Sequence, residues 1–161
     1  MKLRNTALVM VGALSLSVAT AFAADKAIDT KKEAKNGYHQ QRVVYHINNI
    51  NDAKAALRNA KNHMEAVGDE NIDLVVVTHS SGSFALVDGT MGEKDKEGKA
   101  IDLRDDIASL ANRGVRFQIC ANTIKGAKIP KEKISEFAEI IPSGVATVAE
   151  MQLKGYLYVK P

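Results

Sequence analysis

A nearly continuous aliphatic run, IDLVVVT at residues 72–78, constrains the fold more than any other segment. A strand that alternates apolar and polar residues can face water on one side, but a strand without this alternation must be covered on both faces. The run therefore predicts a central strand of a parallel sheet. Apolar residues recur at helical spacing just before it, from 52 to 67, and Gly68 stands where a helix cap belongs.

Strand and helix patterns alternate along the rest of the chain. Further strands are predicted at 42–47, 115–120 and 156–159, and further helices at 102–114, 130–138 and 145–155. Residues 139–141 fit either a short strand or a continuation of the helix before them. Residues 79–100 are expected to form a functional loop or a mobile insertion. The pattern predicts an α/β three-layer sandwich on a mostly parallel sheet of about five strands.

Residues 1–23 have the pattern of a cleavable signal peptide. Lys2 and Arg4 form a basic start, residues 7–19 are mainly apolar, and Ala21-Phe22-Ala23 is a cleavage site of small residues. The apolar stretch is too short to span a bilayer comfortably. We therefore expect export to the periplasm, with no stable membrane anchor after cleavage.

The remaining chain is predicted to consist of a leader and one domain. Residues 24–41 are polar and charged and are expected to be mobile, while residues 42–161 carry the predicted strands and helices. Loss of two positive charges with the signal peptide lowers the formal charge from +3 to +1. A nearly neutral domain without an arginine-rich stripe has little attraction for phosphate backbones, so no nucleic-acid partner is expected.

The 161-residue chain has one cysteine, Cys120. It cannot form an internal disulfide, and no second cysteine is present to resolve a dithiol reaction. Cys120 ends a predicted strand and is followed by a predicted polar loop, in which Asn122, Thr123 and backbone N–H groups could stabilise a thiolate. Cys120 is therefore either a nucleophile or a small buried apolar residue.

His46 and His79 stand at or just past the ends of two other predicted strands. In a parallel sheet, sites form beyond the carboxyl ends of the strands, so both histidines and Cys120 could share one rim. The histidines could tune the thiol, bind copper or zinc together with it, or simply be hydrogen-bonded. His39 and His63 are weaker candidates. No ligand pair has metal spacing, so no metal or other cofactor is expected.

Motifs of several other site classes are absent. The sequence after residue 78 lacks the spacing of a P-loop and of a dinucleotide-binding turn. Ser80, Ser81 and Ser83 lack the Gly-x-Ser-x-Gly context of a hydrolase nucleophile. These serines are expected to belong to a polar, flexible loop.

Two segments resemble the DsrE/DsrF-like sulfur-relay family. VRFQICANTIKGAKIPKEKI, residues 115–134, resembles the family's cysteine segment, and PSGVATVAEMQLKGYLYVKP, residues 142–161, resembles its closing helix and strand. With VVYHINN and IDLVVVTH, the resemblance covers residues 42–161. It implies a YchN-like α/β fold and assembly into trimers or hexamers.

The resemblance also implies a role for Cys120, which matches the position where sulfur-carrier members hold a persulfide. Such a protein takes sulfur from a donor protein or small thiol and passes it to an acceptor, which requires only one thiol. The predicted export departs from the cytoplasmic relay members, so a role in thiouridine synthesis or sulfite reduction is not expected. The alternatives are a non-catalytic oligomeric protein that binds a small ligand or metal at the rim, and a purely structural protein with an inert cysteine.

Overall fold

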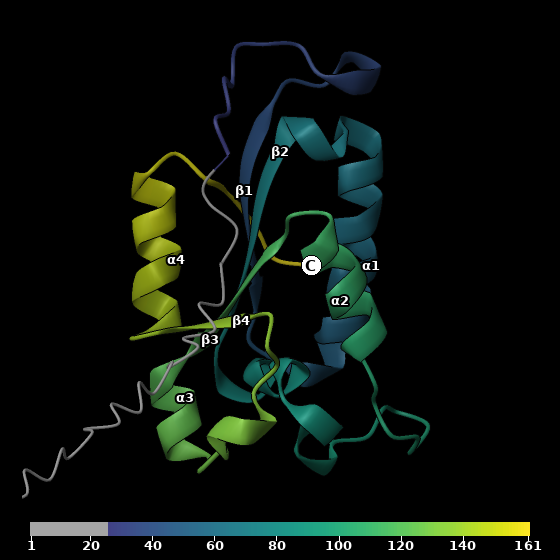
Figure 1. The fold of residues 1–161 in the computed structure, drawn as a ribbon, viewed down its shortest axis with the longest axis vertical. Helices are drawn as coiled ribbons and strands as arrows, with labels where there is room; N and C mark the ends of the chain where they lie inside the picture. Colours follow the sequence, from purple (N-terminus) through teal and green to yellow (C-terminus); the bar gives the residue numbers. More distant parts are fainter. Residues whose placement is uncertain (1–25) are drawn as a thin grey trace, which may run out of the picture.

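A computed structural model describes residues 26–161 (Figure 1). The signal peptide predicted at 1–23 lies outside the described residues. Within this part of the chain, no helix is both long enough and apolar enough to cross a membrane.

Five parallel strands form one sheet in the order β4-β3-β2-β1-β5. The strands are β1 (Gln41–Ile47), β2 (Ile72–Thr78), β3 (Arg116–Cys120), β4 (Ala138–Ile141) and β5 (Leu157–Val159). Every residue of the central strand β2 is buried, as its unbroken aliphatic run predicts. The predicted α/β class and mostly parallel sheet are confirmed, and the sheet is parallel throughout.

Helices cover both faces of the sheet (Figure 1). Helices α1 (Ile50–Val67) and α2 (Arg104–Asn112) lie on one side, and α4 (Gly144–Leu153) lies on the other. Leu74 and Val76 of β2 belong to the core beneath α1 and α2, whereas Val75 and Val77 belong to the core beneath α4. This alternation of side chains across β2 gives the three layers that were predicted.

The segment after β3 differs from the prediction. A helix, α3 (Ala121–Gly126), follows Cys120 directly where a polar loop was expected, and the helix predicted at 130–138 is absent. Lys128 has a φ of 53° just after α3, and a short 3-10 turn, η5 (Lys131–Lys133), follows Pro130. Ile134 then pairs with Val87 in an isolated bridge, and residues 138–141 form β4. The apolar residues that suggested helical spacing are thus divided between a bridge and a strand.

Residues 79–100 are more ordered than predicted. They contain two 3-10 segments, η3 (Ser80–Leu86) and η4 (Asp88–Gly92). Ser83 is fully buried and its hydroxyl accepts a hydrogen bond from Thr78, so the expectation of a flexible serine loop was wrong. Gly82 is held against β1: a Cβ at this position would lie 2.3 Å from the Ile47 carbonyl oxygen.

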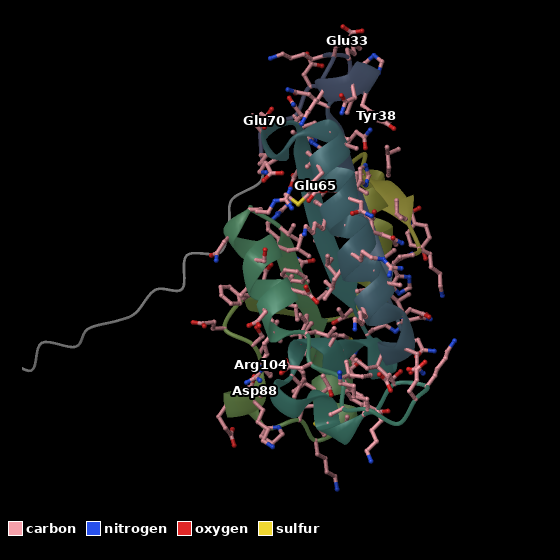
Figure 2. All side chains as sticks on the ribbon, turned by 90° about the vertical axis from the view of Figure 1, so that its right-hand side faces the viewer. Glu33, Tyr38, Glu65, Glu70, Asp88 and Arg104 are labelled. Carbon is pink, nitrogen blue, oxygen red and sulfur yellow. The ribbon has the colours of Figure 1, made fainter. Side chains whose placement is uncertain are left out.

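The end of this segment leads into α2. Asp88 lies beside Arg104 at the start of that helix, as Figure 2 shows. The N-cap residue of α2 is Leu103, so the helix begins two residues later than the predicted start at residue 102. Asp102 instead accepts hydrogen bonds from the backbone and guanidinium of Arg104.

The leader packs on the domain over its described part, from residue 26 onward. Lys26 Nζ donates to the Asp69 carbonyl oxygen at 2.6 Å, and Asn36 Nδ2 donates to the Ala66 carbonyl oxygen at 2.9 Å. These contacts tie the leader and its turn η1 (Lys35–Gly37) to the end of α1 and to the turn η2 (Asp69–Asn71). The leader lies at the end of the sheet opposite to α3 (Figure 1).

Candidate functional site

The carboxyl ends of β1, β2 and β3 bring three predicted residues to one edge of the sheet. His46 is the penultimate residue of β1, His79 directly follows β2, and Cys120 is the last residue of β3. The strand register places His46 beside Val77, and Val77 beside Gln118. His79 and Cys120 therefore lie two residues beyond this pair, at the same edge of the sheet.

Cys120 lies where β3 ends and α3 begins. It is the N-cap residue of α3, although its side chain accepts no hydrogen bond of regular capping geometry. The residue is only 5 % exposed. Burial raises the pKa of the thiol. Four hydrogen-bond donors point toward the sulfur and act in the opposite direction: the backbone N–H groups of Gly144, Thr123 and Asn122, and the Thr123 hydroxyl. The donors outweigh burial, so the pKa of the thiol is lowered overall. The environment favours a thiolate.

Thr123 joins the cysteine to the turn that follows β2. Its hydroxyl oxygen accepts a hydrogen bond of 3.0 Å from the Ser80 backbone N–H, while the hydroxyl is also directed toward Cys120. Ser80 has a φ of 50°, a left-handed conformation that is uncommon for a residue with a Cβ. The contact connects residues 43 positions apart in sequence and fixes the two strand ends to one another.

The two histidines form a stacked pair. Their ring centroids are 4.7 Å apart and the rings are inclined by 29°. Nδ1 of His46 lies 2.9 Å from the Tyr158 hydroxyl, and Nδ1 of His79 lies 3.0 Å from the Ser80 hydroxyl. Burial lowers the pKa of both rings, and the positive charge of Lys160 lowers it further. Both imidazoles are therefore mainly neutral near pH 7.

Gly144, the first residue of α4, lies between the histidine pair and the cysteine. A Cβ on Gly144 would be 2.9 Å from His79 Cβ and 3.0 Å from the Thr78 carbonyl oxygen, while its backbone N–H is directed toward Cys120. Only glycine lets the helix approach the sheet so closely. Ser143 caps α4, because its hydroxyl accepts a hydrogen bond from the Ala146 N–H.

The weaker histidine candidates lie elsewhere. His63, on α1, contacts the Tyr45 hydroxyl and the Gln41 side chain, and His39 forms a bridge with Glu33 in the leader. Among residues 26–161, no three His, Cys, Asp or Glu side chains are arranged to hold a metal ion. The described residues thus do not bring His46, His79 and Cys120 together as a metal-ligating group.

Sequence reasoning did not identify three residues of this rim: Gly144, Tyr158 and Lys160. Tyr158 reaches His46 because β5 pairs with β1, and Lys160 follows directly after β5. Gly144 acts through its backbone. The one available signal was the Ser143-Gly144 pair at the start of a predicted helix, which marks a cap but does not indicate which strand ends the helix faces.

The model of the DsrE/DsrF-like family matches residues 39–161. The chain belongs to the DsrE/DsrF-like family. This membership supports a sulfur-relay type of role at the level of the family. No curated protein matches the chain.

Two solved structures share the fold of this DsrE-like domain. A protein of unknown function, MTH1491 from Methanobacterium thermoautotrophicum, is 25% identical with a TM-score of 0.62, and the match covers 75% of this chain and 99% of that one. The YchN protein from E. coli is 18% identical with a TM-score of 0.60, with the same coverage of 75% and 99%. These similarities confirm the predicted YchN-like fold.

Proposed function

We propose that this protein carries sulfur as a persulfide on Cys120. The observation that supports the proposal is the set of donors directed at the Cys120 sulfur from the starts of α3 and α4. They stabilise negative charge on the sulfur, and the thiolate is the form of cysteine that attacks a sulfur donor. The protein acts as a carrier between two partners, without a turnover reaction of its own.

The transfer needs one thiol and no external oxidant. The Cys120 thiolate attacks the outer sulfur of a donor persulfide, R–S–SH. A new S–S bond forms to Cys120, the donor's S–S bond breaks, and its electron pair leaves with the donor as the thiolate R–S⁻. The transferred sulfur keeps its proton, so the product is Cys120–S–SH. Attack by an acceptor thiolate on the outer sulfur reverses the same exchange and restores the Cys120 thiolate.

Mass spectrometry of the intact protein tests the carrier function. After brief exposure to a persulfide donor and removal of the excess, we expect one added sulfur atom on the natural protein, located on Cys120 by peptide mapping. Cys120→Ser should gain none. The matched control is Ser83→Cys in the Cys120→Ser background, which places a buried thiol away from the rim donors. Equal uptake by Cys120→Ser and the natural protein would overturn the proposal.

We also propose that the protein is exported and works as a trimer or hexamer. Val145 and Leu153 on the outer side of α4 are 64 % and 84 % exposed. In the edge strand β5, which follows α4 in sequence, Leu157 and Tyr158 are also exposed. An apolar outer surface on a helix is typical of a contact with another subunit. Glu150 on this helix and Lys154, its C-cap residue, form an exposed ion pair of 3.6 Å whose opposite charges a second copy could match.

Two measurements test this second proposal. Sedimentation should give the mass of a trimer or hexamer, and Leu153→Glu should dissociate it, whereas Lys61→Glu on an exposed position of α1 should not. A monomeric natural protein would overturn the oligomer. Cell fractionation of the full chain should place a product shortened by the signal peptide in the periplasm, and retention of an uncleaved product in the cytoplasm would overturn export.

A further inference from the structure

The strongest unexplained feature of the rim is a polar atom of His46. Nε2 of His46 is buried and has no hydrogen-bond partner among the described residues, although Nδ1 contacts the Tyr158 hydroxyl. A buried polar group left without a partner destabilises the fold, so such atoms are uncommon and require an explanation.

The contacts of His46 indicate which kind of partner Nε2 can take. When Nδ1 accepts the hydrogen bond of the Tyr158 hydroxyl, the single proton of the neutral ring is on Nε2. Nε2 is then a donor, and it requires an acceptor. The matching acceptor is electron-rich, such as an anionic oxygen or sulfur.

The charges around the pair favour an anion. The positive charge of Lys160 acts on both rings, and His79 also acts on His46. Lys160 Nζ is held at the rim by a hydrogen bond of 3.1 Å to the Asn48 side chain. The start of α4 lies against His79 through Gly144, and a helix N-terminus carries partial positive charge.

A series of contacts connects the histidine pair with Cys120. His46 stacks on His79, His79 lies against Gly144, and the Gly144 N–H is directed toward Cys120. Cys120 is 5 % exposed, which limits access by the cysteine of a large protein more than access by a small ion. A small anion held at the histidine pair would lie beside Gly144, whose backbone N–H is directed toward the sulfur.

We propose that His46, His79 and Lys160 bind a small inorganic anion that contains sulfane sulfur, thiosulfate or a polysulfide, as the sulfur donor for Cys120. This inference rests on the proposed carrier function and names its donor. The donor's anionic end accepts the His46 Nε2–H bond while its sulfane sulfur faces the thiolate.

The transfer balances for both donors. With thiosulfate, the Cys120 thiolate attacks the sulfane sulfur, the S–S bond breaks, and its electron pair leaves with sulfite: Cys–S⁻ and S₂O₃²⁻ give Cys–S–S⁻ and SO₃²⁻. With a polysulfide, the leaving group is the polysulfide shortened by one sulfur. Neither donor requires an oxidant, because the transferred sulfur is already at the sulfane level.

Binding is tested apart from transfer by using Cys120→Ser, which cannot react, with thiosulfate as the probe. Titration calorimetry should show saturable binding of one thiosulfate per chain. His46→Phe keeps a ring but removes the donor, and Lys160→Met removes the charge; each should weaken binding by about tenfold or more. His39→Phe, an exposed position in the leader, should leave the affinity unchanged.

NMR spectroscopy of Cys120→Ser tests the site without substituting a histidine, so it applies even if His46→Phe does not fold. In Cys120→Ser, the NMR signals of the His46 and His79 ring C–H groups should shift on thiosulfate addition, and those of His39 should not. Absence of thiosulfate binding to Cys120→Ser would overturn the inference, and so would an affinity in His46→Phe and Lys160→Met equal to that of Cys120→Ser without them.

Transfer assays then distinguish thiosulfate from polysulfide as the donor, and they test the carrier function separately from the anion site. Sulfite release together with a gain of sulfur on Cys120 identifies thiosulfate, and a gain from polysulfide alone identifies polysulfide. Thiosulfate binding without any gain of sulfur on Cys120 would overturn the carrier function and keep the anion site. A gain from a protein persulfide without thiosulfate binding to Cys120→Ser would overturn the anion site alone.

Discussion

Gly144 and His79 lie in direct contact across the gap between α4 and the end of β2. A Cβ on Gly144 would lie 2.9 Å from His79 Cβ, closer than such carbon atoms approach in folded proteins. The same glycine directs its N–H toward Cys120. The position of α4 over the sheet therefore controls both the histidine pair and the cysteine.

Gly144→Ala should disturb both groups. The added methyl meets His79 Cβ and the Thr78 carbonyl oxygen at 3.0 Å, so the start of α4 must move outward. Overpacking of this kind costs about 1–3 kcal/mol, measured by urea unfolding. The thiol pKa, measured from the pH dependence of alkylation, should rise because a donor moves away from the sulfur. Gly126→Ala, which meets open space, is the matched control and should change neither.

Thr123→Val should raise the pKa of Cys120. The hydroxyl directed toward the sulfur stabilises the thiolate, and valine has a similar shape but no donor. The rate of alkylation should then reach its maximum at a higher pH than in the natural protein, while Thr123→Ser should behave almost like the natural protein. Thr30→Val, at an exposed leader position, is the control. An unchanged pH profile in Thr123→Val would contradict a role for the hydroxyl.

The histidine pair should make the protein less stable in mild acid. Burial lowers the pKa of His46 and His79 from the ordinary value of 6.5, so the unfolded chain binds protons that the folded chain does not. The contribution of the two histidines to stability is then complete above about pH 6.5 and is lost as the pH falls from 6.5 toward their folded pKa values. His63, whose pKa burial also lowers, adds to this loss.

Urea unfolding at about pH 7.5 and about pH 5.5 measures this effect. His46→Phe with His79→Phe should show a smaller fall in unfolding free energy between the two pH values than the natural protein. His39→Phe should show the full fall. Cys120, whose thiol pKa is lowered, is unchanged in all three proteins, so its contribution is common to them. Equal falls in all three proteins would rule out the histidine pair as the cause.

The sequence allowed the fold to be predicted wherever burial left a long periodic signal. The unbroken apolar run of β2 and the regular spacing in α1 each extend over enough residues to exclude other structures. The six residues of α3 are too few for a period to be visible, and their polar composition suggested a loop. Conversely, Ile134 and Ala138 have helical spacing, yet the first pairs with Val87 and the second begins β4.

The candidate site was predictable only for residues whose chemistry is in the side chain. Cys120, His46 and His79 are reactive types at strand ends, which a sequence pattern can indicate. Gly144 contributes a backbone N–H, and no residue type indicates that. Tyr158 reaches His46 through the pairing of β5 with β1, which joins residues 112 positions apart. Such long-range pairing depends on the whole sheet order.

Tyr156→Phe should destabilise the domain through a buried polar network at the other end of the α4 face. The Tyr156 hydroxyl donates to Asp73 at 2.6 Å and accepts from Arg116 at 2.9 Å, and Asp73 is only 1 % exposed. Burial and the neighbouring Asp73 raise the pKa of Tyr156 to about 12. Loss of the hydroxyl leaves the Asp73 carboxylate with one donor fewer, which costs about 1–3 kcal/mol.

The pH dependence separates this network from simple packing. Because the folded pKa lies above the ordinary value of 10, the hydroxyl's contribution is complete below pH 10 and is lost as the pH rises toward about 12. The natural protein should therefore lose stability in this alkaline range more steeply than Tyr156→Phe. Tyr45, whose pKa burial also raises, leaves a residual slope in the variant. Urea unfolding near neutral pH and above pH 10 gives both quantities, with the exposed Tyr38→Phe as control. Equal stability and equal alkaline slopes in Tyr156→Phe and the natural protein would show that the hydroxyl does not stabilise buried Asp73.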